Sequence, residues 1–128
     1  MSDRLAADAV VALHLAFVAF ACLGGLFAWR RLRYAWVHLP ALAWAAWIEL
    51  SGTICPLTPL ENALRRRAGD AGYAGGFVEH YLLPVLYPAG LTPQIQSWIG
   101  IGLIGLNVAI YAVALARWRA RRRQAPSS

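Results

Sequence analysis

Long apolar runs separated by short polar breaks form the main pattern of this chain. The first run, Leu5–Trp29, carries Asp8 at its edge and His14 inside it. Two further runs follow at Tyr34–Ser51 and Gln94–Ala116. A helix rises about 1.5 Å per residue and the hydrocarbon of a bilayer is about 30 Å thick, so runs of this length predict membrane-spanning helices.

The second run has two distinct faces. Residues that follow each other at steps of four, three and four lie on one face of a helix, and here they are His38, Leu42, Ala45 and Glu49. The opposite stripe consists of Trp36, Pro40, Trp44 and Trp47. We expect the aromatic stripe to face lipid and the face with the two ionisable groups to face other helices.

The connection after the second run leaves the membrane pattern. Gly52–Pro56 breaks the helix, and the sequence TPLE at 58–61 has the form of a capping box with proline at the first helical position. The helix that it predicts, Pro59–Ala68, sets leucines against arginines and is short and amphipathic, as helices on a membrane surface are. A glycine-rich loop is predicted over Gly69–Gly76.

The next segment, Phe77–Leu91, is apolar but holds Glu79, His80 and two prolines. Such groups are costly in a lipid-exposed span, so we predict a re-entrant or interfacial segment packed on protein. Together with the amphipathic helix it would form a cap on the outer side of the protein. The predicted fold is therefore an all-α membrane protein, a three-span helical bundle with an outer-side cap.

Composition supports the membrane class. Hydrophobic residues make up 59% of the chain and charged residues 14%, against about a quarter charged in soluble domains. The net charge is +6, and all 12 basic residues are arginine. Eight of them lie beside apolar runs, at 30–33 and 117–123, which indicates membrane topology and lipid head-group contact and argues against a nucleic-acid partner.

The same arginines bear on orientation. With three spans and the N-terminus outside, eight arginines lie on the cytoplasmic side and four on the outer side. With four spans and the N-terminus inside, nine arginines lie on the cytoplasmic side and three on the outer side. Because a fourth span would have to bury Glu79 and His80, we predict three spans, with the N-terminus outside and the C-terminus cytoplasmic. Residues 1–118 then form a single integral membrane domain, and residues 119–128 a basic and polar tail that we expect to be frayed.

Polar residues within the apolar runs mark the candidate site. Counted from the outer surface, His14, Glu49 and Asn107 fall within about 10 Å of one another in depth. Ionisable residues inside a membrane usually face the bundle interior and serve a function. We predict an outward-facing polar pocket with Glu49 and His14 as its core, Asn107 beside them, and Glu79 and His80 above. Its ligand would be a metal ion or the polar head group of a lipid or quinone.

The cofactor stays unknown at this point. A transition metal such as zinc or copper would take its ligands from His14, Glu49, His80 and Cys55. The sequence has no H-x-x-x-H or C-x-x-C spacing, so these ligands would have to converge from different segments. Haem held by two histidines is disfavoured, because His14 and His38 differ in predicted depth by about 10 Å.

Structural interpretations compete with the functional ones. His14 and Glu49 would also hold two helices together simply by pairing, and Asn107 would serve as an interhelical contact. Glu61 is explained by the capping box, and His38 by anchoring at the inner interface. Two other function classes stay open: an accessory or scaffold protein whose polar residues are structural, and a membrane enzyme that uses a Glu–His acid/base pair. The glycines of the last run would permit self-association without requiring it.

Four stretches carry a family resemblance: HLAF at 14–17, RRLRYAWVHLP at 30–40, ICPLTPLEN at 54–62 and GGFVEHYLLPVLYPAGL at 75–91. They resemble a bacterial domain-of-unknown-function family of small polytopic inner-membrane proteins, and the resemblance extends to about Trp118. It implies a stand-alone protein of the bacterial inner (cytoplasmic) membrane with no established activity. It also draws attention to six residues: His14, Glu49, Cys55, Glu61, Glu79 and His80.

Overall fold

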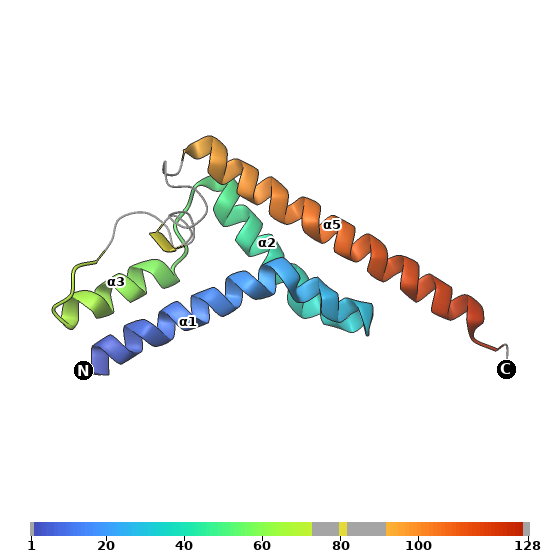
Figure 1. Ribbon diagram of the computed structural model, residues 1–128, viewed down its shortest axis with the longest axis horizontal. Coiled ribbons are helices and arrows are strands. Elements are labelled where there is room, and N and C mark those ends of the chain that lie inside the picture. The colour runs from blue at the N-terminus through green and yellow to red at the C-terminus, as the bar shows by residue number, and fades with distance from the viewer. Residues whose placement is uncertain (1, 73–79, 82–91, 127–128) are drawn as a thin grey trace.

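The computed structural model describes residues 2–72, 80–81 and 92–126, and within these ranges the chain forms helices and no strand. In chain order the elements are α1 (Ser2–Leu23), the 3₁₀ helices η1 (Gly24–Trp29) and η2 (Leu32–Tyr34), α2 (Ala35–Ser51), α3 (Leu57–Arg67) and α5 (Pro93–Gln124). Helices α1 and α3 lie side by side in one part of the molecule, and η1, α2 and α5 pack together in the other (Figure 1). The all-α prediction is confirmed for the described residues.

Two helical segments are long and apolar enough to cross a membrane, Ser2–Trp29 and Gln94–Gln124. Helix α2 begins within one residue of its predicted start and has 17 residues, about 25 Å of helix. This is slightly less than the hydrocarbon thickness of a bilayer. The predicted re-entrant segment, Phe77–Leu91, lies outside the described residues except for His80 and Tyr81.

The first apolar run is not one continuous α-helix, contrary to the prediction. Helix α1 ends at Leu23, and the chain continues as η1. Two glycines at the change lie tightly against other helices: a Cβ on Gly24 would be 2.5 Å from Cδ2 of His38, and one on Gly25 would be 2.9 Å from Cγ2 of Ile110. The backbone therefore approaches α2 and α5 more closely than any side chain would allow.

Where α1 gives way to η1, carbonyl groups at the end of α1 lose their partners within the α-helix. Side chains from α2 and α5 donate hydrogen bonds to these carbonyl groups. His38 Nε2 and Asn107 Nδ2 each lie 3.2 Å from the carbonyl oxygen of Ala21, and Asn107 Nδ2 lies 3.4 Å from that of Cys22. Because a carbonyl only accepts, Nε2 of a neutral His38 carries the hydrogen, and Nδ1 accepts from the Tyr111 hydroxyl at 2.7 Å. We call this set of contacts the α1 junction.

Buried residues at seven-residue spacing, alanine or glycine except for His14 and Asn107, line the inner side of both long helices. In α1 and η1 these positions are Ala7, His14, Ala21 and Ala28, and in α5 they are Gly100, Asn107 and Ala114. A seven-residue repeat keeps one narrow seam facing the neighbouring helices, and small side chains let the backbones come close. Much of the remaining surface of both helices is exposed and rich in large hydrophobic residues, as expected of helices in lipid.

The aromatic stripe of α2 lies where its spacing predicts. Trp36, Trp44 and Trp47 are 85%, 44% and 52% exposed, whereas His38 on the opposite face is buried. Near the C-terminal end of α2, Leu50 packs against Gly100 of α5. A Cβ added to Gly100 would lie 2.9 Å from the Cγ of Leu50. The predicted two-faced character of this helix is therefore confirmed.

Helix α5 runs to Gln124, so the prediction of a frayed tail over residues 119–128 is wrong for residues 119–124. Contacts with the end of η1 explain the difference. The Arg117 guanidinium lies 5.4 Å from the centre of the Trp29 ring, and Arg121 donates to the carbonyl oxygens of Trp29 and Arg30 at 3.0 and 3.2 Å. These contacts hold the last turns of the helix against a segment about ninety residues earlier in the chain.

The glycine contacts give a direct test of the α1 junction. Replacement Gly24→Ala should lower the free energy of unfolding by about 1–3 kcal/mol, because His38 is held by two hydrogen bonds and cannot move away from the new methyl group. Gly105→Ala is the matched control: nothing lies within 4 Å of the added Cβ, and alanine favours a helix. Unfolding of the purified protein in detergent would measure both. Equal loss in the two variants would contradict the packing described here.

Candidate functional site

Buried polar side chains gather at two separate places among the described residues. One is the α1 junction, with His38 and Asn107. The other is the interface of α1 and α3, where His14, Thr58, Glu61 and Asn62 are buried. The second place contains an acid, a histidine and, close by, charged partners, so it is the candidate functional site.

Helix α3 runs back along the N-terminal half of α1, in the opposite direction. Two pairs of opposite charge and a third pair, of a histidine and an acid, follow one another along the two helices: Arg4 with Asp70, Asp8 with Arg65, and His14 with Glu61. The first pair is joined by two hydrogen bonds of 2.6 and 3.0 Å, and the second approaches to 3.7 Å. The third pair interacts electrostatically. The signs alternate along each helix, which fixes their relative register.

Glu61 is the centre of this interface and has no exposed surface. Its Oε1 accepts hydrogen bonds from Arg65 Nε at 2.8 Å and from the Tyr81 hydroxyl at 2.5 Å. Arg65 Nη2 also donates to the Tyr81 oxygen at 3.1 Å, which closes a triangle of three side chains beside His14. The cation and the hydroxyl replace the water that the buried carboxylate has lost. We call Glu61, Arg65, Tyr81 and His14 the α1–α3 polar site.

The predicted capping role of Glu61 is wrong. Helix α3 begins at Leu57, its N-cap residue is Pro56, and no side chain caps it. Thr58 therefore lies inside the first turn, and its hydroxyl is buried without a hydrogen-bond partner among the described residues. Instead, Glu61 faces α1 and binds Arg65, which lies one turn later in α3. Its four-residue spacing from Arg65 is the sequence signal that would have indicated this pairing.

The predicted core of Glu49 with His14 is not what the structure shows. Glu49 is half-buried against α5. A Cβ added to Gly100 of α5 would lie 3.3 Å from the Cβ of Glu49. No hydrogen bond or ion pair involves its carboxyl group in the part of the chain described here. Among the described acids, the one whose charge acts on His14 is Glu61. The physical reason is that α3, and not the C-terminal end of α2, packs on this half of α1 (Figure 1).

The other predicted pocket residues lie apart from one another. Asn107 belongs to the α1 junction, where it joins His38 at the Ala21 carbonyl group. His80 is exposed and packs edge-on against Tyr81, with ring centres 4.6 Å apart, so it lies next to the α1–α3 polar site. Glu79 falls outside the described residues.

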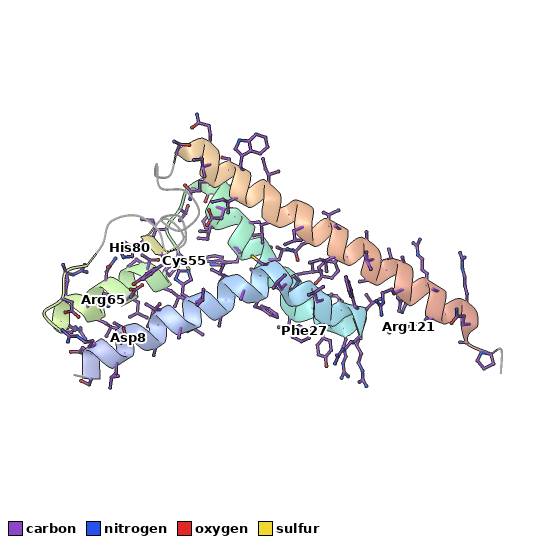
Figure 2. All side chains as sticks on the ribbon, in the orientation of Figure 1. Asp8, Phe27, Cys55, Arg65, His80 and Arg121 are labelled. Atoms are coloured by element: carbon purple, nitrogen blue, oxygen red, sulfur yellow. The ribbon has the colours of Figure 1, made fainter. Side chains whose placement is uncertain are left out.

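The predicted metal ligands were His14, Glu49, His80 and Cys55. Among residues 2–72, 80–81 and 92–126, no three His, Cys, Asp or Glu side chains are grouped closely enough to hold a metal ion. Cys55 is a half-buried free thiol just before α3, and Figure 2 shows it and His80 near the start of that helix, with Asp8 and Arg65 farther along. The described geometry therefore does not gather the four residues into one site.

A surface hollow of about 390 Å³ opens beside this site and is lined by Arg4, Leu5, Asp8 and Ala68. Asp8 links the hollow to the polar site through its contact with Arg65. The hollow combines charged groups with an exposed leucine.

Comparison with known proteins agrees with the resemblance noted from the motifs. Residues 4–112 match the family described as "Protein of Unknown function (DUF2784)". The chain belongs to this family. The match runs from the first turn of α1 into α5 and includes both groups of buried polar residues. No curated protein and no solved structure matches the chain.

A pair of matched variants tests the importance of Glu61. Glu61→Gln should lower the free energy of unfolding by about 1–3 kcal/mol, because it removes the charge that Arg65 and Tyr81 bind in a buried place. Glu49→Gln should change it by no more than about 0.5 kcal/mol, because no described group pairs with that carboxyl. Chemical unfolding in detergent measures both. A larger loss in the Glu49 variant would contradict the assignment of the site.

The Tyr81 hydroxyl provides a pH test. Burial raises the pKa of Tyr81 above its ordinary value of 10.0, and the hydrogen bond to Glu61 raises it further. Since the folded-state pKa is the higher one, the hydroxyl contributes its full stability below pH 10 and loses it as the pH rises through the folded-state pKa. The alkaline loss of stability should be smaller in Tyr81→Phe than in the unchanged protein.

Absorbance difference titration between the two proteins gives the folded-state pKa of this one tyrosine directly. A Tyr81 that ionises at the ordinary pKa of a tyrosine would contradict its hydrogen bond to Glu61.

Proposed function

We propose that this family member is a small integral membrane protein whose α1–α3 polar site binds the polar head group of a lipid or quinone. One observation carries the proposal: a fully buried acid of α3, held by Arg65 and Tyr81, lies at the interface with the largely apolar helix α1, close to the buried His14. Chains seldom keep such a group of ionisable residues in an apolar helix without a function.

The arrangement of the arginines supports three spans, α1 with η1, α2 and α5. Arg121 binds the carbonyl groups of Trp29 and Arg30, so the arginines at 30–33 and those at 117–123 belong to one end of the molecule. The positive-inside rule favours a cytoplasmic position for this end, and with it an outer N-terminus and an α1–α3 polar site on the outer side of a bacterial inner membrane. At 17 residues, α2 is long enough to span with slight local thinning of the bilayer.

Helix lengths support a position of the polar site near the outer head groups. At about 1.5 Å per α-helical residue and 2.0 Å per 3₁₀ residue, α1 and η1 together are about 45 Å long, against about 30 Å of hydrocarbon. With Trp29 and Arg30 at the inner surface, the first turns of α1 extend beyond the hydrocarbon on the other side. His14 then lies near the boundary, at the level of lipid head groups.

The chemistry of the site favours a ligand with oxygen acceptors. Arg65 and Tyr81 are hydrogen-bond donors, and a neutral His14 has one donor nitrogen. Carbonyl oxygens of a quinone or ester and phosphate oxygens of a lipid accept from such groups, and Glu61 balances the charge of Arg65. The hydrophobic tail of the ligand would lie along exposed α1 residues such as Leu5, which also lines the hollow beside Asp8.

A second candidate function is an accessory or scaffold protein. The observation that favours it is the closed triangle of Glu61, Arg65 and Tyr81, whose members satisfy one another within the chain. In that case the site only holds α3 on α1, and a protein partner binds elsewhere. An enzyme that uses the Glu61–His14 pair as acid and base stays a hypothesis without an identified reaction.

Binding measurements on the purified protein separate these candidates. The probes are a short-chain ubiquinone and a short-chain phospholipid, titrated in detergent and followed by tryptophan fluorescence. The unchanged protein should bind one of them, and His14→Gln and Tyr81→Phe should each weaken that binding about tenfold, the cost of one lost hydrogen bond to a ligand. Glu49→Gln is the control and should bind normally. Failure of both probes to bind, with all variants folded, would favour the scaffold function.

A further inference from the structure

The charges of this chain are divided between the two ends of the molecule. Eight of the 12 arginines lie at the end formed by η1, η2 and the last turns of α5: Arg30, Arg31, Arg33, Arg117, Arg119, Arg121, Arg122 and Arg123. All six acidic residues lie elsewhere in the sequence, at Asp3, Asp8, Glu49, Glu61, Asp70 and Glu79. The ion pairs of the described residues involve Arg4 and Arg65 only. We call the eight arginines the basic end.

The two halves of the basic end are far apart in sequence but are joined in the fold. Arg121 donates to the carbonyl oxygens of Trp29 and Arg30, which brings the end of α5 against the turn after η1. Figure 2 shows Arg121 on α5 facing the region where η1 and α2 meet. Eight positive charges are therefore held near one another, and no acidic side chain within residues 2–72, 80–81 and 92–126 forms an ion pair with them. Such a group destabilises the fold by self-repulsion unless anions are supplied from outside.

Aromatic rings alternate with these arginines. Arg117 lies over Trp29, Arg122 over Trp118 at 4.6 Å, and Arg33 over Tyr34 at 5.6 Å. Tryptophan and tyrosine rings of this kind are typical of the level where hydrocarbon meets lipid head groups. Exposed apolar side chains continue directly from them, including Phe27 at 56% exposure. A nucleic acid would meet the same positive charge but would gain nothing from this apolar border.

Helix length puts the same arginines at the surface of the bilayer. The part of α5 before Arg117 is about 36 Å long, enough to cross about 30 Å of hydrocarbon. The arginines after it extend into the head-group layer, where the anionic lipids of a cytoplasmic leaflet attract basic residues.

We propose that the basic end is a binding site for anionic phospholipids of the leaflet that faces the C-terminus, with each lipid phosphate held by arginines from both clusters. This site is distinct from the α1–α3 polar site at the other end of the molecule. Its ligand is recognised by the phosphate charge and by the apolar border of the site.

The test uses the full-length protein in a neutral detergent, with short-chain phosphatidylglycerol as the probe and short-chain phosphatidylcholine as the neutral comparison. Tryptophan fluorescence follows binding, since Trp29 and Trp118 lie beneath arginines of the site. We expect phosphatidylglycerol to bind much more tightly than phosphatidylcholine. Its binding should weaken as salt is added, because ions screen exposed charges.

Two triple variants probe the two clusters separately: Arg30→Gln with Arg31→Gln and Arg33→Gln, and Arg119→Gln with Arg122→Gln and Arg123→Gln. Both keep Arg117 and Arg121, which hold α5 on η1. Each should weaken phosphatidylglycerol binding about a hundredfold, the effect of three arginines near an anionic surface. If one variant fails to fold, the other still decides the outcome.

The control is Arg66→Gln with Arg67→Gln, an equal kind of change on the exposed end of α3. It should bind phosphatidylglycerol like the unchanged protein. An equal loss in this control would overturn the proposal, as would equal binding of the two lipids. Tighter binding of a short RNA than of phosphatidylglycerol would overturn it in favour of a nucleic-acid partner. Loss in the two triple variants with normal ubiquinone binding would support a lipid site independent of the α1–α3 polar site.

Discussion

The structure depends on hydrogen bonds to the backbone carbonyl groups at the point where α1 ends and η1 begins. In apolar surroundings a carbonyl without a donor costs several kcal/mol, so a break inside an apolar helix requires replacement donors. His38 from α2 and Asn107 from α5 supply them at Ala21. One carbonyl group thus joins three helices, and the two glycines that follow let those helices approach closely. The polar residues there hold the core of the protein together.

The junction also explains how the α1–α3 polar site arises. Because η1 and the end of α1 are tied to α2 and α5, the N-terminal half of α1 is left to pack on α3 (Figure 1). Helix α3 returns along it in the opposite direction and brings Glu61 to His14. The buried acid is then held by Arg65 and Tyr81, so the same contacts that dock α3 also assemble the candidate site.

The two ends of the molecule have different characters. The end with the N-terminus carries paired charges of both signs around a buried acid, whereas the opposite end carries arginines without acidic partners. Apolar helices connect the two. Such a division fits a protein that crosses a membrane, recognises a small amphipathic molecule on one side and is anchored by lipid charge on the other.

The sequence by itself determined the features that depend on neighbours along the chain. The apolar helices, the exposed stripe of Trp36, Trp44 and Trp47, and the amphipathic α3 follow from local periodicity, and the structure agrees with them. Glu61 was given a capping role because TPLE at 58–61 also fits a capping box, and local spacing does not show which helix packs opposite.

Tertiary structure alone decided which acid meets His14, where α1 breaks, and how far α5 continues. Depth along a helix follows from counting residues, but it does not give the direction in which a side chain points or the identity of its neighbour. His14 and Glu61 are 47 positions apart, and Arg121 and Trp29 are 92 apart. Contacts over such distances are set by the packing of whole helices, in which each buried polar group must find a partner, and no local pattern encodes that choice.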